Sequence, residues 1–145
     1  MQQATYNGTA NEMQRGGAAA ACSQARVRTT IANVNAGATL LPAVPGLAYR
    51  LIYFALIAVG GAVTGATDVR ILGTRTAGSV ALGVAPVAGL TQSAVVESGD
   101  AGMTLLADGA SFTALDPNTP VTIGKTGGAG ATATNVDALL VYALE

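Results

Sequence analysis

The 145-residue sequence contains no histidine, no tryptophan and a single cysteine, and only 10% of its residues are charged. Without histidine, the chain lacks the commonest general base near neutral pH, the commonest metal ligand, and the Ser-His and Cys-His couples of nucleophilic catalysis. One cysteine, Cys22, excludes an internal disulfide and a cysteine-rich metal site. We expect Cys22 to be a small, buried, apolar side chain.

Large side chains are scarce as well, because aromatic residues make up only 4% of the chain. Hydrophobic residues reach 50%, but a count along the sequence gives 30 alanines, and there are 19 glycines besides. Small side chains fill a core poorly, and a typical soluble protein carries roughly 25% charged residues. The composition therefore predicts an oligomer whose apolar interfaces hide much of its surface.

The few positive charges are scattered, and only Arg26 and Arg28 lie close together. Nucleic-acid binding needs a clustered basic footprint, so we expect no DNA or RNA partner. The first 17 residues, MQQATYNGTANEMQRGG, show no basic segment followed by an apolar one and do not resemble a secretory signal. The sequence thus predicts a protein made and kept in a reducing cytoplasm.

One uncharged stretch, residues 51–67, raises the question of a membrane span. A spanning helix needs about 20 apolar residues, with a minimum near 17. This stretch contains Gly60-Gly61, and glycine costs about 1 kcal/mol relative to alanine within a helix. Its first part is rich in aromatic and branched residues, which favour strands. We predict a long central strand covered on both faces, then a Gly-Gly turn and a strand over 68–73, and no membrane partner.

From Ala25 onward the chain alternates short apolar runs with turn residues, which is typical of an all-β sandwich or barrel. The closing segment, NVDALLVYALE, has Val136, Ala138, Leu140 and Tyr142 on one face of a strand. A helix over 136–144 is the main alternative there. We predict an all-β sandwich or barrel over 25–145. The expected strands are 25–33, 36–41, 49–60, 67–74, 79–87, 90–96, 120–125 and 135–145, with a hairpin around Asp108-Gly109 within 104–115.

Residues 1–24 differ from the rest, because they are polar, then rich in glycine and alanine, without strand alternation. Such a segment does not fold alone. We predict an extended N-terminal arm that a neighbouring subunit or partner holds in place. The expected partner-binding residues are Tyr6, Asn7, Glu12, Met13 and Arg15 in the arm, with Arg26 and Arg28 in the first strand.

Motifs that could carry chemistry fail on inspection. Gly124-Lys125-Thr126 ends like a phosphate-binding loop, but Thr119 stands where that motif requires its first glycine. Gly128, Gly130 and Ala133 fit G-x-G-x-x-A, but a dinucleotide site needs a helix next and an acidic residue about twenty positions on, so we expect a glycine-rich loop. Three aspartates spaced by eight, at 100, 108 and 116, lie in turn sequences. We therefore expect no enzyme, no catalytic residue, no metal, no cofactor and no small-molecule substrate.

Four phrases in order carry a family resemblance: NAGATLLPAVPGLAYRLIYFALIAVGG, ATDVRILGT, AVVESGDAGMTLLADGASF and VTIGKTGGAGATATNVDALLVYALE. Together they resemble the head decoration, or cement, proteins of tailed bacteriophages. The similarity covers residues 30–145, and the arm takes no part in it. It implies a β-sandwich or jelly roll, so that we expect a jelly-roll-like β-sandwich over 25–145 with the extended arm before it. It also implies copies clustered, often as trimers, on the outer surface of the capsid where shell subunits meet, with the major capsid protein as partner.

This resemblance and the composition lead to the same hypothesis, a homotrimeric virion protein that stabilises the assembled phage head. The alternative is a recognition module of a tail or fibre that binds glycans on the host surface. Such sites expose aromatic side chains, and most of the six aromatic residues here fall within expected core strands. A bacterial surface or membrane protein is the third possibility.

Overall fold

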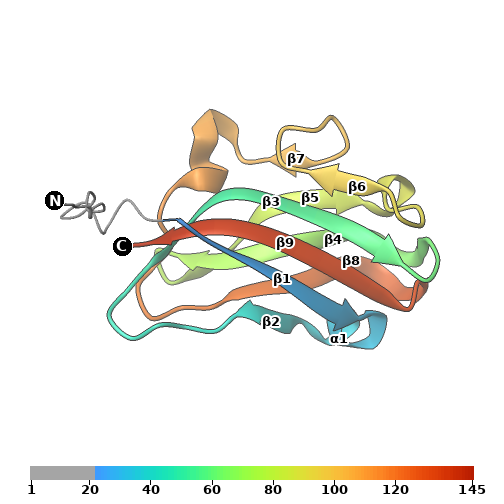
Figure 1. Cartoon of the computed structure of the whole chain (residues 1–145), viewed down its shortest axis with the longest axis horizontal. Coiled ribbons are helices and arrows are strands. Elements are labelled where there is room, and N and C mark those ends of the chain that lie inside the picture. The colour runs from blue at the N-terminus through green and yellow to red at the C-terminus, as the bar shows by residue number, and fades with distance from the viewer. Residues whose placement is uncertain (1–21) are drawn as a thin grey trace, which may run out of the picture.

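A computed structural model describes residues 22–145, which form two antiparallel sheets packed face to face (Figure 1). The first sheet has the strand order β1-β9-β3-β6, and the second has the order β2-β8-β4-β5-β7. The strand bounds are β1 Ser23–Thr30, β2 Ala38–Leu41, β3 Tyr49–Val59, β4 Val63–Arg75, β5 Gly78–Pro86, β6 Val95–Glu97, β7 Thr104–Leu105, β8 Val121–Thr132 and β9 Asn135–Leu144.

The pairing of strands is that of a jelly roll, which confirms the predicted fold. Strand β1 pairs with β9, β2 with β8, β3 with β6 and β4 with β5, all antiparallel. These nested pairs describe one long hairpin rolled up so that its strands fall into two sheets. Only β7 stands outside this pattern, as a two-residue strand at the edge beside β5. The rolled hairpin brings the last strand next to the first, so the C-terminus lies beside the start of β1 (Figure 1).

The core lies between the sheets and follows the period-2 pattern of each strand. In β9 the residues Val136, Ala138 and Leu140 are buried, as the alternation predicts. The helix considered for this segment is therefore wrong. Larger side chains fill the centre of the core, and its fully buried members include Phe54, Leu56, Val69, Ile71, Leu82, Val121 and Ile123.

A short helix, α1 (Ile31–Ala36), replaces the last part of the strand expected over 25–33. The Thr30 hydroxyl accepts a hydrogen bond from the Asn33 amide, which caps the first turn. Gly37 ends the helix in the left-handed conformation, at φ 83°. These two caps stop the strand at Thr30, and strand alternation alone gives no sign of them.

Other elements also differ from expectation. No hairpin forms around Asp108-Gly109. The 3₁₀ helix η3 (Ala107–Phe112) follows β7, and no later strand of the described chain pairs with β7. Both residues have left-handed φ angles, so the turn itself is present. The expected strand over 90–96 shrinks to β6, preceded by the single turn η2 (Val87–Gly89). Residues 127–130 belong to β8 rather than to a loop, and Gly127 pairs with Ala66 of β4 between two register shifts.

Strand β3 occupies a central place in the first sheet, between β9 and β6, as predicted for 51–59. Its core side is buried at Leu51, Phe54 and Leu56. On the opposite side Ile57 is half-buried and Ile52 is exposed, so no layer of the described chain covers that face. Within residues 22–145, no helix is long and apolar enough to cross a membrane.

The boundary between arm and sandwich lies slightly earlier than expected. Ser23 and Gln24 already pair with Tyr142 and Val141 of β9, so the sheet begins at residue 23. Cys22, expected to be buried, is exposed, because it precedes the first paired residue of an edge strand. The remaining arm and its expected partner-binding residues Tyr6, Asn7, Glu12, Met13 and Arg15 lie outside the described residues.

Candidate interaction surface

The strongest candidate site is the outer face of the first sheet, the side of β1, β9, β3 and β6 that points away from the core. Residues opposite each other on neighbouring strands share a face, so the strand register defines this surface. One row across the sheet runs Arg26, Leu139, Ala55, Glu97, and the next runs Arg28, Asp137, Ile57, Val95. Val141 and Tyr53 continue the surface toward the start of β1, beside Gln24.

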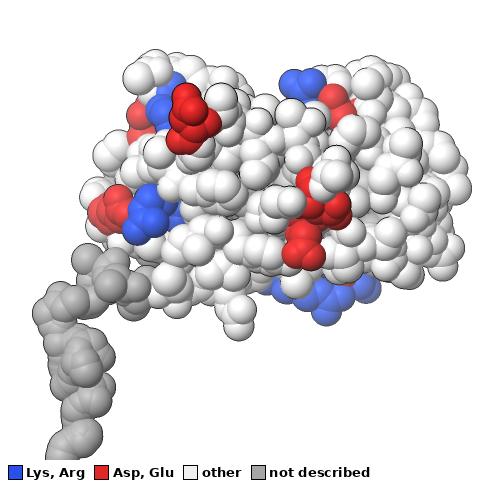
Figure 2. All heavy atoms as spheres, turned by 90° about the horizontal axis from the view of Figure 1, so that it is seen from above, with Lys and Arg blue, Asp and Glu red and all other residues white. Residues whose placement is uncertain are grey.

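The centre of the outer face is apolar and its edges are charged. Leu139, Val141 and Ile57 are only partly buried, and Val95 at the β6 edge is 49% exposed. Strands of an antiparallel sheet with a solvated face normally place polar residues there. Contiguous exposed apolar surface is unusual in a monomer and marks sites of interaction. Figure 2, which views the molecule from the β6 and β7 side, shows charges in a few separate groups with wide uncharged areas between them.

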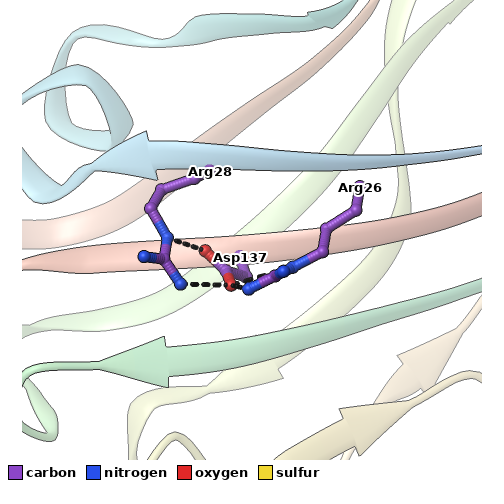
Figure 3. A network of polar contacts seen from close by, with 3 residues as sticks. All are labelled: Arg26, Arg28 and Asp137. Atoms are coloured by element: carbon purple, nitrogen blue, oxygen red, sulfur yellow. Dashed lines mark hydrogen bonds and ion pairs between the residues drawn. The ribbon is translucent and has the colours of Figure 1, made fainter.

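The β1 edge carries a cluster of two arginines around one aspartate (Figure 3). Arg28 binds Asp137 through two hydrogen bonds, Nε to Oδ1 at 2.7 Å and Nη2 to Oδ2 at 2.8 Å. Arg26 donates from Nε to Oδ2 at 3.2 Å and also from Nη2. The Asp137 side chain is only 2% exposed, whereas both arginine side chains are more than half exposed. One unit of positive charge therefore remains at this edge.

Hydrogen bonds from Arg28 hold the pKa of Asp137 at about 2, below its ordinary value, against the opposing effect of burial. Arg26 adds to the same lowering. A carboxylate with both oxygens engaged by guanidinium groups is a poor proton acceptor near neutral pH. The cluster fixes β1 on β9 and is poorly suited to acid-base chemistry.

At the opposite edge, Glu97 has a different environment. Its Oε2 accepts a hydrogen bond from the Tyr53 hydroxyl at 3.2 Å. Burial raises the pKa of Tyr53 above its ordinary value, and Glu97 raises it further. Among residues 22–145, no arginine or lysine forms an ion pair with Glu97. The outer face thus has an excess positive charge at the β1 edge and an uncompensated negative charge at the β6 edge.

An open hollow of about 350 Å³ lies on the outer face near the start of β1. Its lining combines an aromatic ring, a guanidinium and an amide with aliphatic side chains: Gln24, Ala25, Arg26, Tyr53, Leu139, Leu140 and Val141. This hollow lies beside the start of β1.

The second sheet carries one ion pair of its own. Arg70 Nε donates to Asp68 Oδ1 at 2.8 Å and Nη2 donates to Oδ2 at 3.0 Å, both within β4. Hydrogen bonds from Arg70, with a contribution from Thr126, lower the pKa of Asp68. This pair is satisfied within its own sheet, so it gives no sign of a partner.

Two of the three predicted turn aspartates bind backbone amides. Asp116 accepts from Thr76 N at 3.0 Å and from Ala77 N at 2.8 Å, which holds the β4–β5 turn. Asp100 accepts from Gly102 N at 3.0 Å within its own turn. In the described part of the chain, no group of three Asp, Glu, Cys or His side chains is placed to hold a metal ion.

Of the predicted partner-binding residues, Arg26 and Arg28 lie together on the outer face. Their shared carboxylate, Asp137, lies 109 or more positions away and could not be predicted from the spacing of the two arginines. Glu97, Val95 and Tyr53 were not singled out, although the alternation of their strands places them on a solvent side once the strand order is known. Comparison with family models, curated proteins and solved structures finds no match to this chain.

Proposed function

We propose that this protein is a structural component of a tailed-phage virion, a decoration protein that binds the outside of the assembled head and stabilises it. The observation that carries the proposal is the apolar outer face of the first sheet, with arginines at one edge and Glu97 at the other. A small sandwich with such a face is suited to binding other protein surfaces.

The resemblance to decoration proteins supports the same function. Its four phrases fall on α1 to β3, on β4, on β6 to η3, and on β8 to β9. They therefore include three of the four strands of the first sheet and most of the second sheet. The phrases omit all of β1, so they do not extend to the arginine edge.

The proposed action is thermodynamic. A protein that binds only the assembled shell stabilises that shell by mass action, by an amount that grows with its free concentration relative to the dissociation constant. Copies joined as a trimer would engage several shell subunits at once, which raises the effective concentration of each further contact. The major capsid protein and other copies of this chain are the proposed partners, on the capsid surface.

The test is co-sedimentation with empty heads assembled from the major capsid protein encoded in the same genome. We expect the purified protein to sediment with expanded heads at a fixed ratio to the shell subunits, and to raise the temperature at which the heads disrupt. Unassembled capsid protein serves as the control and should not bind. Equal binding to assembled and unassembled protein, or none to either, would refute the proposal.

One observation favours a second candidate, recognition of a glycan by the hollow beside Tyr53. Sugars stack on aromatic rings and bind arginine and amide groups, and this lining contains all three. A glycan array probed with the purified protein separates the two functions. Binding of defined sugars that is lost in Tyr53→Ala, without any binding to heads, would favour the recognition module.

A further inference from the structure

We propose that the outer face of the first sheet is the contact between copies of this chain, with the Arg26 edge of one copy against the Glu97 edge of the next, closing in a ring of three. The number of copies rests on the proposed function. The choice of face rests on the strand register and the charges.

The register places opposite charges at the two edges of one row. Arg26 lies opposite Leu139, Leu139 opposite Ala55, and Ala55 opposite Glu97. Three strand spacings of about 4.8 Å separate the ends of this row by about 14 Å. Arg26 and Glu97 of one molecule are thus too far apart to pair with each other, although each bears a charge that its own neighbours do not balance.

The unbalanced charge at each edge of the sheet comes from particular side chains. Arg26 and Arg28 share the single carboxylate of Asp137, which leaves one positive charge, and within residues 22–145 their Nη1 groups make none of these bonds. Glu97 has a phenol as its partner and no cation within the described chain. A head-to-tail contact pairs these charges in every copy, which is how heterologous interfaces form closed rings.

The width of the sheet suits three copies. In a ring of three, the first sheets of the three copies form the sides of a triangle. Each sheet of four strands is about 14 Å wide, and one further strand spacing at each corner makes each side about 19 Å. The centre of the triangle lies about 5.5 Å from each sheet, close to half of the roughly 10 Å at which packed sheets stand apart. Leu139, Val141 and Ile57 would then meet near the axis. Four copies would leave the centre about 9.5 Å from each sheet, which is too far for side chains to fill.

The edge strands also favour this arrangement. β1 pairs with β9 over eight residues without a bulge or a proline, and no other strand of residues 22–145 pairs with its second side, which is a regular edge. Such an edge is a template for pairing unless it is blocked or covered. Both arginines of β1 bind Asp137 on the neighbouring strand β9, so their side chains do not block pairing at the outer edge of β1.

Cysteine cross-linking tests the contact directly. The variant Arg26→Cys/Glu97→Cys is made in the Cys22→Ser background and oxidised at low micromolar concentration. Within one chain these positions stand about 14 Å apart. A disulfide needs Cα atoms within about 7 Å, so only a contact between copies allows one. We expect covalent species that end at three chains on a non-reducing gel.

The single variants Arg26→Cys and Glu97→Cys are the matched controls and should remain uncrosslinked. In the ring a β1 edge contacts only a β6 edge, so two copies of the same cysteine do not come together. Because the double variant lacks the two paired charges, the mass of the unsubstituted protein is measured beside it. Monomers in the double variant together with a mass of one chain for the unsubstituted protein would overturn the proposal. A series that ends at two chains would overturn the ring of three in favour of a two-fold pair. Cross-linking in either single variant would show that a different face makes the contact.

A second measurement uses repulsion in a variant expected to fold. Val95→Arg places a positive charge on the Glu97 edge, in the row of Arg28. Leu47→Arg is the control, because Leu47 is 36% exposed and lies outside the first sheet. By light scattering we expect the Leu47 variant to keep the mass of three chains, and the Val95 variant to dissociate at a concentration at least about tenfold higher than the wild type. Equal masses for the two variants would contradict the proposed face.

These results remain separable from the proposed function. A ring of three that cross-links as expected and yet fails to bind heads would refute only the decoration role. A monomer that binds heads would refute only the ring.

Discussion

Arg28 and Asp137 face each other across β1 and β9 and are joined by two hydrogen bonds of 2.7 and 2.8 Å. The paired geometry matches the fork of a guanidinium to the two oxygens of a carboxylate. Because Asp137 is buried while its arginine partners are exposed, the cluster anchors the edge strand to the sheet.

Asp137→Asn should therefore destabilise the sandwich. The amide keeps the shape of the side chain but lacks the charge, and its nitrogen cannot accept from a guanidinium. We expect a loss of about 1–3 kcal/mol in the free energy of unfolding, measured by urea denaturation. Glu145→Gln is the control, because it disrupts the more exposed pair with Arg50 and should cost less than about 1 kcal/mol. Equal effects of the two substitutions would show that burial of Asp137 adds nothing.

The same cluster predicts a pH dependence. Asp137 has a pKa of about 2 in the folded protein, below its ordinary value of 3.8, so the folded state binds this proton less readily than the unfolded state. Its stabilising contribution, about 1–2 kcal/mol, is complete above about pH 5 and is lost as the pH falls toward 2. The difference in unfolding free energy between wild type and Asp137→Asn should narrow over this range. A constant difference from pH 7 to pH 2 would contradict the assignment.

The alternating strands, with glycine, proline and aspartate in the turns, predicted a β-sandwich or barrel, and the family resemblance added the jelly roll. Strand β9 is an example, since the alternation of Val136, Ala138 and Leu140 predicts its buried face even when the neighbouring strands are unknown. The helix α1 was missed because its caps, Thr30 and Gly37, stand at the end of an alternating run. Six residues are too few for a helical period to be recognised against that pattern.

The candidate surface was less predictable, because it depends on which strands become neighbours. Arg26 and Arg28 were chosen from their spacing, but Asp137 lies more than a hundred positions away. Glu97 joins the same row only through Leu139 and Ala55. A pattern of residues within one strand assigns a face and leaves open what lies beside it on that face.

A close contact in the core gives a test of the packing. Gly83 of β5 has no side chain, and an added Cβ would lie 2.4 Å from Phe54 Cε2 and 2.9 Å from Met103 Sδ. Gly83→Ala should therefore force both side chains to move, at a cost of about 1–3 kcal/mol in calorimetric or urea unfolding. Gly78→Ala, in the same strand, is the control, because its Cβ would approach only Arg75 O at 3.6 Å. Similar stabilities of the two variants would contradict the packing around Phe54.

The last prediction concerns the arm and its boundary. Removal of residues 1–21 leaves every described strand intact, whereas removal of residues 1–24 also deletes Ser23 and Gln24, which pair with Tyr142 and Val141. We expect the shorter deletion to melt within about 2 °C of the full chain, and the longer one to melt at least about 4 °C lower. If the arm contacts the capsid, both should bind heads at least about tenfold more weakly, a loss of about 1.4 kcal/mol. Head binding at full strength by the shorter deletion would assign recognition to the sandwich alone, and would remove Tyr6, Asn7, Glu12, Met13 and Arg15 from the proposed binding residues.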